Sequence, residues 1–388
     1  MLTQGKVFWS NPHHVQHPLA DGRLECDFLI VGGGISGVMT AYLLATHKLG
    51  SVVLVERDLI GSGATGASAG MIVKEFEGVD FDTLAMTYGN KATRAYWKAH
   101  SEMYDMLKGI LKEEKFECDM REGDIYIVSR NEEQKKKVTE DISMRRKLGV
   151  NVLAVDQNLL LEDIRLSGFN FGEKVEKGLS VNPVKLVQGL AEAAVRKGVR
   201  IFENSSVTKM GEGIAYTAHS EIRFKTTIVV TDSFGPENPI DTFRTSIGLT
   251  RQLTRDELEA LRLDDFDMVV ESESRGYHYL KVTHDRRILI GFGDELVSIG
   301  DKAHLPIAQH VIDMNHFAKE IFPQTDLAFE HVWTGTYGLS KNLIPHLSFS
   351  KSKIVMCGAG LQLTSMMMTK FIVDRLRNKG TLLDCLYK

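Results

Sequence analysis

A glycine pattern near the start of the chain places the strongest constraint on its fold. Gly32, Gly34 and Gly37 fit G-x-G-x-x-G, between the apolar run 28–31 and the helix-like run 35–47. Gly32 allows a tight turn, Gly34 lets the backbone approach a pyrophosphate, and Gly37 lets a helix pack on a strand. The order of strand, glycine turn and helix therefore predicts a βαβ unit that binds a dinucleotide.

The residues around this turn extend the predicted site. The helix begins at about Ile35 and Ser36, where free N–H groups and a partial positive charge favour phosphates. A second apolar run, 51–55, ends at Glu56, whose carboxylate can accept hydrogen bonds from a ribose. Arg57 follows and is included in the predicted site. The alternative is a glycine-rich turn that holds no ligand.

The overall composition narrows the class of protein. The 388 residues are 43% hydrophobic and 25% charged, as in a globular chain long enough for two domains. A net charge of −4 gives no electrostatic reason to expect nucleic acid or an anionic membrane as a partner. The four cysteines show no C-x-x-C spacing, so we expect neither a disulfide framework nor a metal site. We recognise no signal peptide or transmembrane segment and expect a cytoplasmic protein.

The periodicity of apolar residues predicts alternating helices and strands. Helices are expected over 82–116, 131–148, 183–197 and about 364–378, and strands over 121–129, 199–203, 226–231 and 353–357. Two further runs, 277–282 and 287–291, resemble a hairpin. We expect the charges of 131–148 to form a solvated face, and 1–24 to form a polar arm with solvated histidines.

These elements predict an α/β fold with an α+β second domain. The first domain would be Rossmann-like and built from non-contiguous segments, namely 1–80, 150–235 and 330–388. The second would be an inserted substrate domain with a mixed sheet, made of 81–149 and 236–329. A ligand held by the first domain would face the second at the mouth of the parallel sheet.

A second ligand loop follows the strand that ends at Glu56. Small and hydroxyl-bearing residues dominate 61–72. Such a run suits backbone and hydroxyl contacts with a pyrophosphate and a flat ring. A flexible glycine-rich linker is the alternative. The candidate cofactor contacts in this loop are Gly63, Ala64, Thr65, Ser68, Ala69, Gly70 and Met71.

Together these motifs resemble one family. The chain is similar over nearly its whole length to the FAD-dependent amine oxidoreductases that include D-amino-acid oxidase, glycine oxidase and sarcosine oxidase. The resemblance rests on the first glycine motif with Glu56, on 63–71, on 182–207 and on a C-terminal region. That region contains Trp333-x-Gly335, the run 343–345, Gly358-Ala359-Gly360 and Thr364.

The resemblance implies FAD as the cofactor and assigns more residues to it. Val207 would lie on the adenine side. Residues near the flavin would be Gly358, Gly360, Leu361 and Thr364. Covalent members of the family attach the flavin through Cys or His. Because no cysteine lies between residues 333 and 346, and Cys357 does not match the expected position, we expect non-covalent FAD.

The strand 277–282 supplies the candidate substrate residues. Alternation places Tyr279 and Lys281 on one face and His278 on the other. Family members commonly carry an arginine where Lys281 aligns, so Lys281 would anchor a substrate carboxylate with Tyr279 beside it. A shifted register would match Gly276-Tyr277-His278 and place His278 in the pocket. A third reading is a packing strand with a surface lysine.

The resemblance implies the oxidation of a small amine or amino acid similar to glycine, sarcosine or a D-amino acid. A hydride would pass from the α-carbon to flavin N5, and the imine would be hydrolysed. Two alternatives stay open: an FAD-dependent dehydrogenase of a 2-hydroxy acid or polyol phosphate, and a flavoprotein that acts on tRNA. The acidic net charge counts against tRNA. The electron acceptor could be oxygen, a quinone or an electron-transfer protein.

Overall fold

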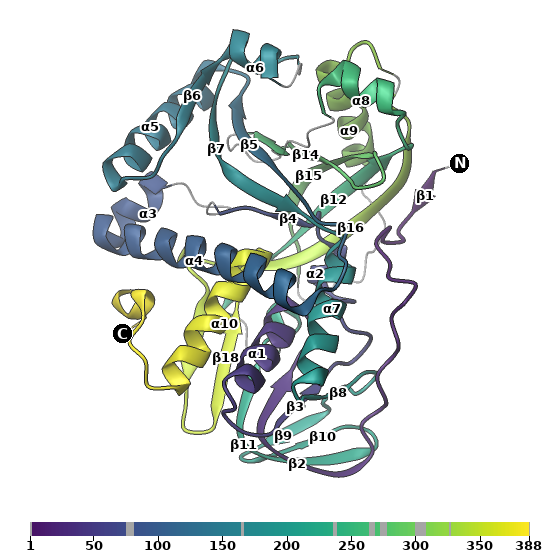
Figure 1. The fold of residues 1–388 in the computed structure, drawn as a ribbon, viewed down its shortest axis with the longest axis vertical. Helices are drawn as coiled ribbons and strands as arrows, with labels where there is room; N and C mark the ends of the chain where they lie inside the picture. The colour runs from purple at the N-terminus through teal and green to yellow at the C-terminus, as the bar shows by residue number, and fades with distance from the viewer. Residues whose placement is uncertain are drawn as a thin grey trace.

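Two β-sheets with their covering helices make up the fold (Figure 1). The computed structural model describes residues 2–74, 81–163, 167–235, 239–263, 268–271, 278–298, 308–325 and 327–387. The smaller sheet, with α1, α7 and α10, occupies the lower half of Figure 1, and the larger sheet occupies the upper half. The α/β fold predicted from the sequence is confirmed.

The smaller sheet has the parallel centre of a dinucleotide-binding fold. Its strands run in the order β17-β18-β11-β2-β3-β8, and the four pairs from β18 to β8 are all parallel. A hairpin of β9 and β10 extends it beside β11. The strands are β2 (Gly22–Val31), β3 (Val52–Val55), β8 (Arg200–Phe202), β9 (Lys209–Gly211), β10 (Ile214–Tyr216), β11 (Ser220–Val229), β17 (His346–Phe349) and β18 (Lys353–Cys357).

Helices cover this sheet and bury its apolar face. Helix α1 (Ile35–Thr46) packs against α7 (Pro183–Arg196), α10 (Gln362–Leu376) and β3. The start of α7 is specified locally, because the Asn182 side chain accepts the N–H groups of Val184 and Lys185 while Pro183 occupies the first turn. The three consecutive methionines 366–368 of α10 are buried in the core, which agrees with a packing role.

The larger sheet is mixed and mainly antiparallel. Its strands run in the order β1-β16-β12-β15-β14-β13-β5-β7-β4, with β6 paired to β7. The predicted hairpin is present as β14 and β15, which pair antiparallel. The strands are β1 (Thr3–Gln4), β4 (Met71–Ile72), β5 (Arg121–Ser129), β6 (Leu153–Asp156), β7 (Phe171–Ser180), β12 (Ile240–Thr250), β13 (Met268–Glu271), β14 (His278–Val282), β15 (Ile288–Leu296) and β16 (Phe329–Ser340).

The remaining helices lie around and between the sheets. The long helix α4 crosses the middle of the molecule and contacts α3 and α10 (Figure 1). These helices are α2 (Ala64–Ala67), α3 (Phe81–Tyr88), α4 (Asn90–Glu114), α5 (Glu132–Leu148), α6 (Gln157–Asp163), α8 (Arg255–Leu261), α9 (Ala308–Ile321), η1 (Asp232–Phe234) and η2 (Leu382–Cys385). Over the described ranges, no helix has both the length and the apolar character required to cross a bilayer.

The membership of the strands differs from the predicted domain ranges in two places. Residues 153–180 were expected in the FAD-binding domain, but β6 and β7 belong to the larger sheet. Strand β16 was also expected there, and it pairs with β12 in the larger sheet. Strand periodicity identifies a strand but not its neighbour, because pairing depends on residues far apart in sequence. The domain ranges themselves stay a prediction.

Individual residues are packed in two regions that were expected to be solvated. In the N-terminal arm, His14 Nε2 lies 3.2 Å from Glu203 Oε1, and the backbone N–H of His17 donates to Glu203 Oε2. Glu203 is fully buried, so the arm closes over a carboxylate. In α5, Arg145 is buried although it lies in a highly charged helix. Lysines 135–137 on the same helix are partly or largely exposed, as expected.

Candidate active site

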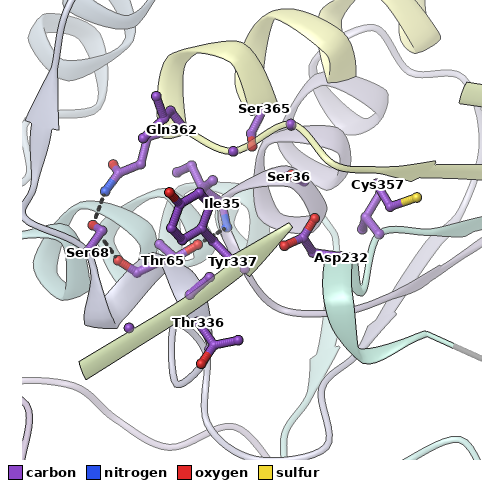
Figure 2. Close-up of a pocket in the computed structure, with 18 of the residues that line it drawn as sticks. Ile35, Ser36, Thr65, Ser68, Asp232, Thr336, Tyr337, Cys357, Gln362 and Ser365 are labelled. Carbon is purple, nitrogen blue, oxygen red and sulfur yellow. Dashed lines mark hydrogen bonds between the residues drawn. The ribbon is translucent and has the colours of Figure 1, made fainter. Parts of the chain in front are cut away.

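One continuous cavity of about 670 Å³ runs from the parallel sheet to the face of the larger sheet. Figure 2 shows the part of it where 35–36, 65–68, 336–337 and 357–365 meet. Its lining therefore comes from both sheets and from loops far apart in sequence. The predicted cofactor residues that line it are Gly32, Gly34, Ile35, Ser36, Glu56, Arg57, Gly63, Ala64, Thr65, Ser68, Ala69, Gly70, Met71, Val207, Gly360 and Leu361.

The first glycine turn has the close packing that the sequence predicts. A Cβ on Gly37 would lie 1.8 Å from the carbonyl oxygen of Gly32, so α1 touches the turn through a bare backbone. Gly32 itself has φ +115°, a conformation that favours glycine. Gly37 does not line the cavity, so its role is the predicted packing of helix on strand.

The start of α1 is only partly capped. The N-cap residue is Gly34, which has no side chain to accept the first N–H groups. Thr65 Oγ1 accepts the N–H of Ile35 at 3.0 Å, which ties the second ligand loop to the helix start. Figure 2 shows Thr65 beneath Ile35. A helix start whose backbone N–H groups have no cap side chain to accept them is suited to bind phosphate.

Glu56 closes β3 at the edge of the cavity as predicted. Its Oε2 accepts the Gly33 N–H at 2.6 Å, and its Oε1 accepts the Asp58 N–H at 3.0 Å. The carboxylate therefore also holds the glycine turn. The neighbouring Arg57 guanidinium lies over the Phe234 ring, 4.6 Å from its centroid. Whether Glu56 contacts a ribose stays a prediction.

The second ligand loop is fixed from three sides. The indole N–H of Trp9 donates to the Ser68 carbonyl at 2.8 Å, and that of Trp333 donates to the Ala67 carbonyl at 2.9 Å. From the opposite side, Gln362 Nε2 donates to Ser68 Oγ at 2.6 Å (Figure 2). These three bonds hold the loop as a wall of the cavity, which does not fit the alternative of an unattached glycine-rich linker.

These features fit the group that the glycine motifs predict. The cavity has a bare backbone turn, a partly capped helix start and room for an extended ligand. In addition, the buried Gln362 Oε1 lines this cavity and has no hydrogen-bond partner among the described residues. A buried acceptor without a partner carries a free-energy cost that a bound donor removes. A flavin dinucleotide satisfies each of these requirements.

Two predicted C-terminal contacts are corrected. Thr364 does not line the cavity; its hydroxyl lies 3.2 Å from His100 Nε2 inside the core. Helix α10 begins two residues earlier than expected, so Gln362 and Ser365 face the cavity instead. Gly358 also lies behind the surface, where its N–H donates to Asp232 Oδ1 at 2.9 Å.

Asp232 joins the two backbones that enclose this end of the cavity. Its Oδ2 accepts the N–H of Gly338 at 2.8 Å, and its Oδ1 accepts the N–H of Gly358. Burial raises the pKa of this carboxyl above its usual value. Figure 2 shows it beside Cys357. The sequence reasoning missed Asp232, although an acid directly after the strand expected over 226–231 is a usable signal.

The larger sheet supplies the other half of the cavity through one row of residues. The strand register places seven residues opposite one another across seven strands, and successive partners share a face of the sheet. Trp333, at one end of the row, holds the second ligand loop. Glu173, at the other end, is three strands away from Tyr279, which corresponds to about 14 Å. The row is Trp333, Ile247, Gly291, Tyr279, Val270, Ile127 and Glu173.

Tyr279 lies in this row and lines the cavity as predicted. Gly291 is directly opposite it, and a Cβ there would lie 1.9 Å from Cζ of the tyrosine. The ring therefore lies across the neighbouring strand, and the glycine makes room for it. Its role in binding a substrate stays a prediction.

The other two predicted substrate residues are corrected. Lys281 is fully buried, and its Nζ donates to the carbonyl oxygens of Gly70 and Val181 at 3.0 and 3.2 Å. It supports the second ligand loop from behind and does not line the cavity, so it is no carboxylate anchor. Burial lowers the pKa of this lysine to about 7.

His278 also lies outside the cavity, on the opposite face of β14. Its ring is stacked between those of Phe292 and Phe317, with centroid distances of 4.4 and 3.8 Å. The alternation predicted for this strand is therefore correct, and the shifted register is wrong for His278. Gly276 and Tyr277, the other residues of that pattern, lie outside the described residues.

A buried group of charges ends the row. Arg145 Nε lies 2.5 Å from Asp141 Oδ2 and 3.4 Å from Glu173 Oε1. All three residues line the cavity, and their side chains are nearly inaccessible to solvent. The charge of Arg145 is thus compensated by two carboxylates, which lowers its availability for a substrate anion.

Several cavity residues were not found from the sequence. The most informative is Asp294, which lines the cavity beside Thr245 and Tyr337. Its signal is the run Gly291-Phe292-Gly293-Asp294, because glycines inside a strand often mark a bulge. Among the residues that the structure describes, no group of three potential metal ligands is present, and each of the four cysteines is a free thiol.

Comparison with known proteins agrees with this geometry. The family model described as "DAO: FAD dependent oxidoreductase" matches residues 27–373. The "Gamma-glutamylputrescine oxidoreductase" of Escherichia coli (strain K12) is 25% identical over 334 residues, covering 83% of this chain and 76% of that protein.

A second relative, from Bacillus subtilis (strain 168), is named "Putative Rieske 2Fe-2S iron-sulfur protein YhfW". It is 27% identical over 197 residues, covering 50% of this chain and only 37% of that protein. The crystal structure of glycine oxidase from Geobacillus kaustophilus has the same fold, with a TM-score of 0.77, 18% identity and coverage of 92% and 96% of the two chains. The chain belongs to the DAO family of FAD-dependent oxidoreductases, and FAD is its cofactor.

Proposed function

We propose that this FAD-dependent oxidoreductase oxidises a small primary or secondary amine or an amino acid. The main support is that one continuous cavity is lined both by the glycine loops of the parallel sheet and by residues of the row on the larger sheet. The names of two similar proteins, a glycine oxidase and a gamma-glutamylputrescine oxidoreductase, refer to compounds with a C–N bond, which supports an amine substrate.

The residues of the chain have separable tasks in such a reaction. FAD supplies the acceptor for the hydride that leaves the carbon next to the substrate nitrogen. The helix start at Gly34 and the turn at Gly32 bind the phosphates, and the tied loop around Ser68 limits motion of the ring. Tyr279 and Ile247 form the wall that orients the substrate and excludes water.

We also propose that FAD is held without a covalent bond. Cys357 lines the cavity, but burial raises the pKa of its thiol to about 12, so it stays in the unreactive neutral form. Acid precipitation should release all of the yellow colour into the supernatant. Colour that stays with the denatured protein contradicts this proposal.

The substrate proposal is tested by reduction of the flavin without oxygen. The purified holoprotein is mixed anaerobically with glycine, sarcosine, D-alanine, L-proline, putrescine and γ-glutamylputrescine, and absorbance near 450 nm is followed. We expect at least one amine to bleach the flavin. Lactate, glycerol 3-phosphate and malate form the second arm. Bleaching by these alone would replace the amine proposal with the hydroxy-acid or polyol-phosphate alternative.

A further inference from the structure

A β-bulge in β15 directs one carboxylate into the substrate half of the cavity. In the pairing of β12 with β15, Arg244 stands opposite Glu295 and Ser246 stands opposite Phe292. Two residues of β15, Gly293 and Asp294, therefore oppose a single residue of β12. Gly293 has φ +77°, as expected for the glycine of such a bulge. Bulges of this kind change the direction of a side chain, and Asp294 lines the cavity as a result.

The surroundings of Asp294 resemble a ligand-binding site more than a structural ion pair. The carboxylate lies within hydrogen-bonding reach of the Tyr337 and Thr245 side chains, and both also line the cavity. The Thr245 hydroxyl also donates to the Phe292 carbonyl at 3.3 Å. Within the described residues, no lysine or arginine forms an ion pair with it. Its neighbour Glu295, by contrast, is bound to Arg244 at 2.6 Å. Burial raises the pKa of Asp294 above its usual value.

The cations near this end of the cavity are already engaged. Arg145 is bound by Asp141 and Glu173, and Lys281 supports the second ligand loop from behind. Lys137, which also lines the cavity, pairs with Glu133 on its own helix at 3.9 Å. Over the described residues, Asp294 is therefore an acid that lines the cavity without a lysine or arginine paired to it. An acid in a partly buried cavity recognises an ammonium group and not a carboxylate.

We propose that Asp294 is a catalytic residue that binds the ammonium group of the substrate and takes one of its protons. This inference rests on the proposed oxidation of an amine and adds the residue that recognises the nitrogen. The Tyr337 side chain holds the carboxylate in place by a hydrogen bond, and Thr245 lies beside it.

The proton transfer balances within the pair. The ammonium R–NH₃⁺ and the carboxylate of Asp294 become the neutral amine R–NH₂ and the carboxylic acid. A neutral nitrogen has the lone pair that supports loss of a hydride from the adjacent carbon, whereas an ammonium does not. A carboxyl with a raised pKa is a better acceptor for this proton than one with an ordinary pKa.

The test uses a cation that cannot be oxidised. tert-Butylammonium has no hydrogen on the carbon next to nitrogen, and tert-butanol is its neutral counterpart of similar shape. Binding to the FAD-loaded protein is measured by calorimetry and by the shift in the flavin spectrum. For Asp294→Asn, we expect tert-butylammonium to bind roughly 10- to 100-fold more weakly, with tert-butanol unchanged.

Asp241→Asn is the matched control, because Asp241 lies on β12 in an exposed ion pair with Lys341. It should leave the affinity for tert-butylammonium unchanged. Equal affinity of wild type and Asp294→Asn for the cation, or no binding of the cation to wild type, overturns the proposal. If the cation binds as expected but no amine of the panel bleaches the flavin, the proposed function fails while the ammonium site stands.

The variant Tyr337→Phe gives a second, independent test, which holds even if Asp294→Asn fails to fold. The groups that face Asp294 are Tyr337 from β16, Thr245 from β12 and His310 from α9, and each lowers its pKa. Removal of the Tyr337 hydroxyl therefore raises that pKa. We expect the lower pH limit of tert-butylammonium binding to move upward. An unchanged pH profile contradicts the assignment of the carboxylate.

Discussion

The two ends of the cavity are built in different ways. At the cofactor end, two short glycine-rich segments bring bare backbone to the surface, beside side chains such as Glu56, Arg57 and Val207. At the substrate end, the register of seven strands sets one row of residues opposite one another, and five of the seven line the cavity. The first end depends on local conformation and the second on long-range pairing. Substitutions at the two ends should therefore change different quantities, namely FAD binding and turnover.

The largest expected effect is at the cofactor end. Gly37→Ala places a Cβ 1.8 Å from the Gly32 carbonyl oxygen, so α1 must move away from the turn. We expect the purified variant to lose FAD, seen as a collapse of the ratio of absorbance at 450 nm to that at 280 nm. Gly109→Ala is the matched control, since it is also helical and has no atom within 4 Å of the new Cβ. A yellow Gly37→Ala protein would contradict the packing role.

The next prediction concerns the pH dependence of stability. It depends on Lys281, which supports the second ligand loop between the two ends of the cavity. Because its pKa is about 7 when folded and about 10.4 when unfolded, the unfolded chain keeps a proton that the folded chain loses above pH 7. Stability should therefore rise with pH from about 7 upward. The contribution of this group between pH 7 and 8.5 is up to about 2 kcal/mol.

Lys281→Met should remove this rise, measured by urea unfolding at several pH values. Lys351→Met, at an exposed position, should keep it. Gly70 O still accepts the N–H of Val181 in the variant, so the loop retains one of its bonds. The same pH slope in wild type and Lys281→Met would show that the lysine does not titrate in this window.

At the substrate end, Gly291→Ala should alter turnover and spare the cofactor. The new Cβ would lie 1.9 Å from Cζ of Tyr279, so the ring must leave its position over the strand. Displacement of a positioning group lowers kcat/KM, here by roughly 10-fold. FAD content should stay at the wild-type level. Gly211→Ala, whose Cβ meets Ile214 at an ordinary 3.5 Å, should change neither quantity. Loss of FAD from Gly291→Ala would mean that the ends are not separable.

The smallest change that we predict is a weaker affinity for FAD after a substitution at the cofactor end. Thr65→Val removes the hydroxyl that accepts the Ile35 N–H at 3.0 Å. The loss of one such bond is worth about 1 kcal/mol, which corresponds to an increase of roughly 5-fold in the Kd for FAD. Thr87→Val, which removes an exposed hydroxyl in α3, is the control. An unchanged Kd for Thr65→Val would show that the link between loop and helix does not reach the cofactor.

Prediction from the sequence succeeded where one short segment contains the whole signal. The turn at Gly32, the start of α7 at Pro183 and the hairpin of β14 and β15 each depend on neighbouring residues. It failed where a role depends on which way a residue faces. Lys281 and Thr364 were placed at the site, yet one supports a loop from behind and the other bonds His100 in the core.

The glycine motifs were enough to predict that this chain binds a dinucleotide and belongs among the FAD-dependent oxidoreductases, because they act through local backbone geometry. That Asp294 lines the cavity became evident only from the folded arrangement of the strands. Asp294 reaches the cavity through a bulge opposite Thr245, and the row through Tyr279 exists only once seven strands are in register. Register is a property of pairs of distant strands, so no single stretch of sequence contains it.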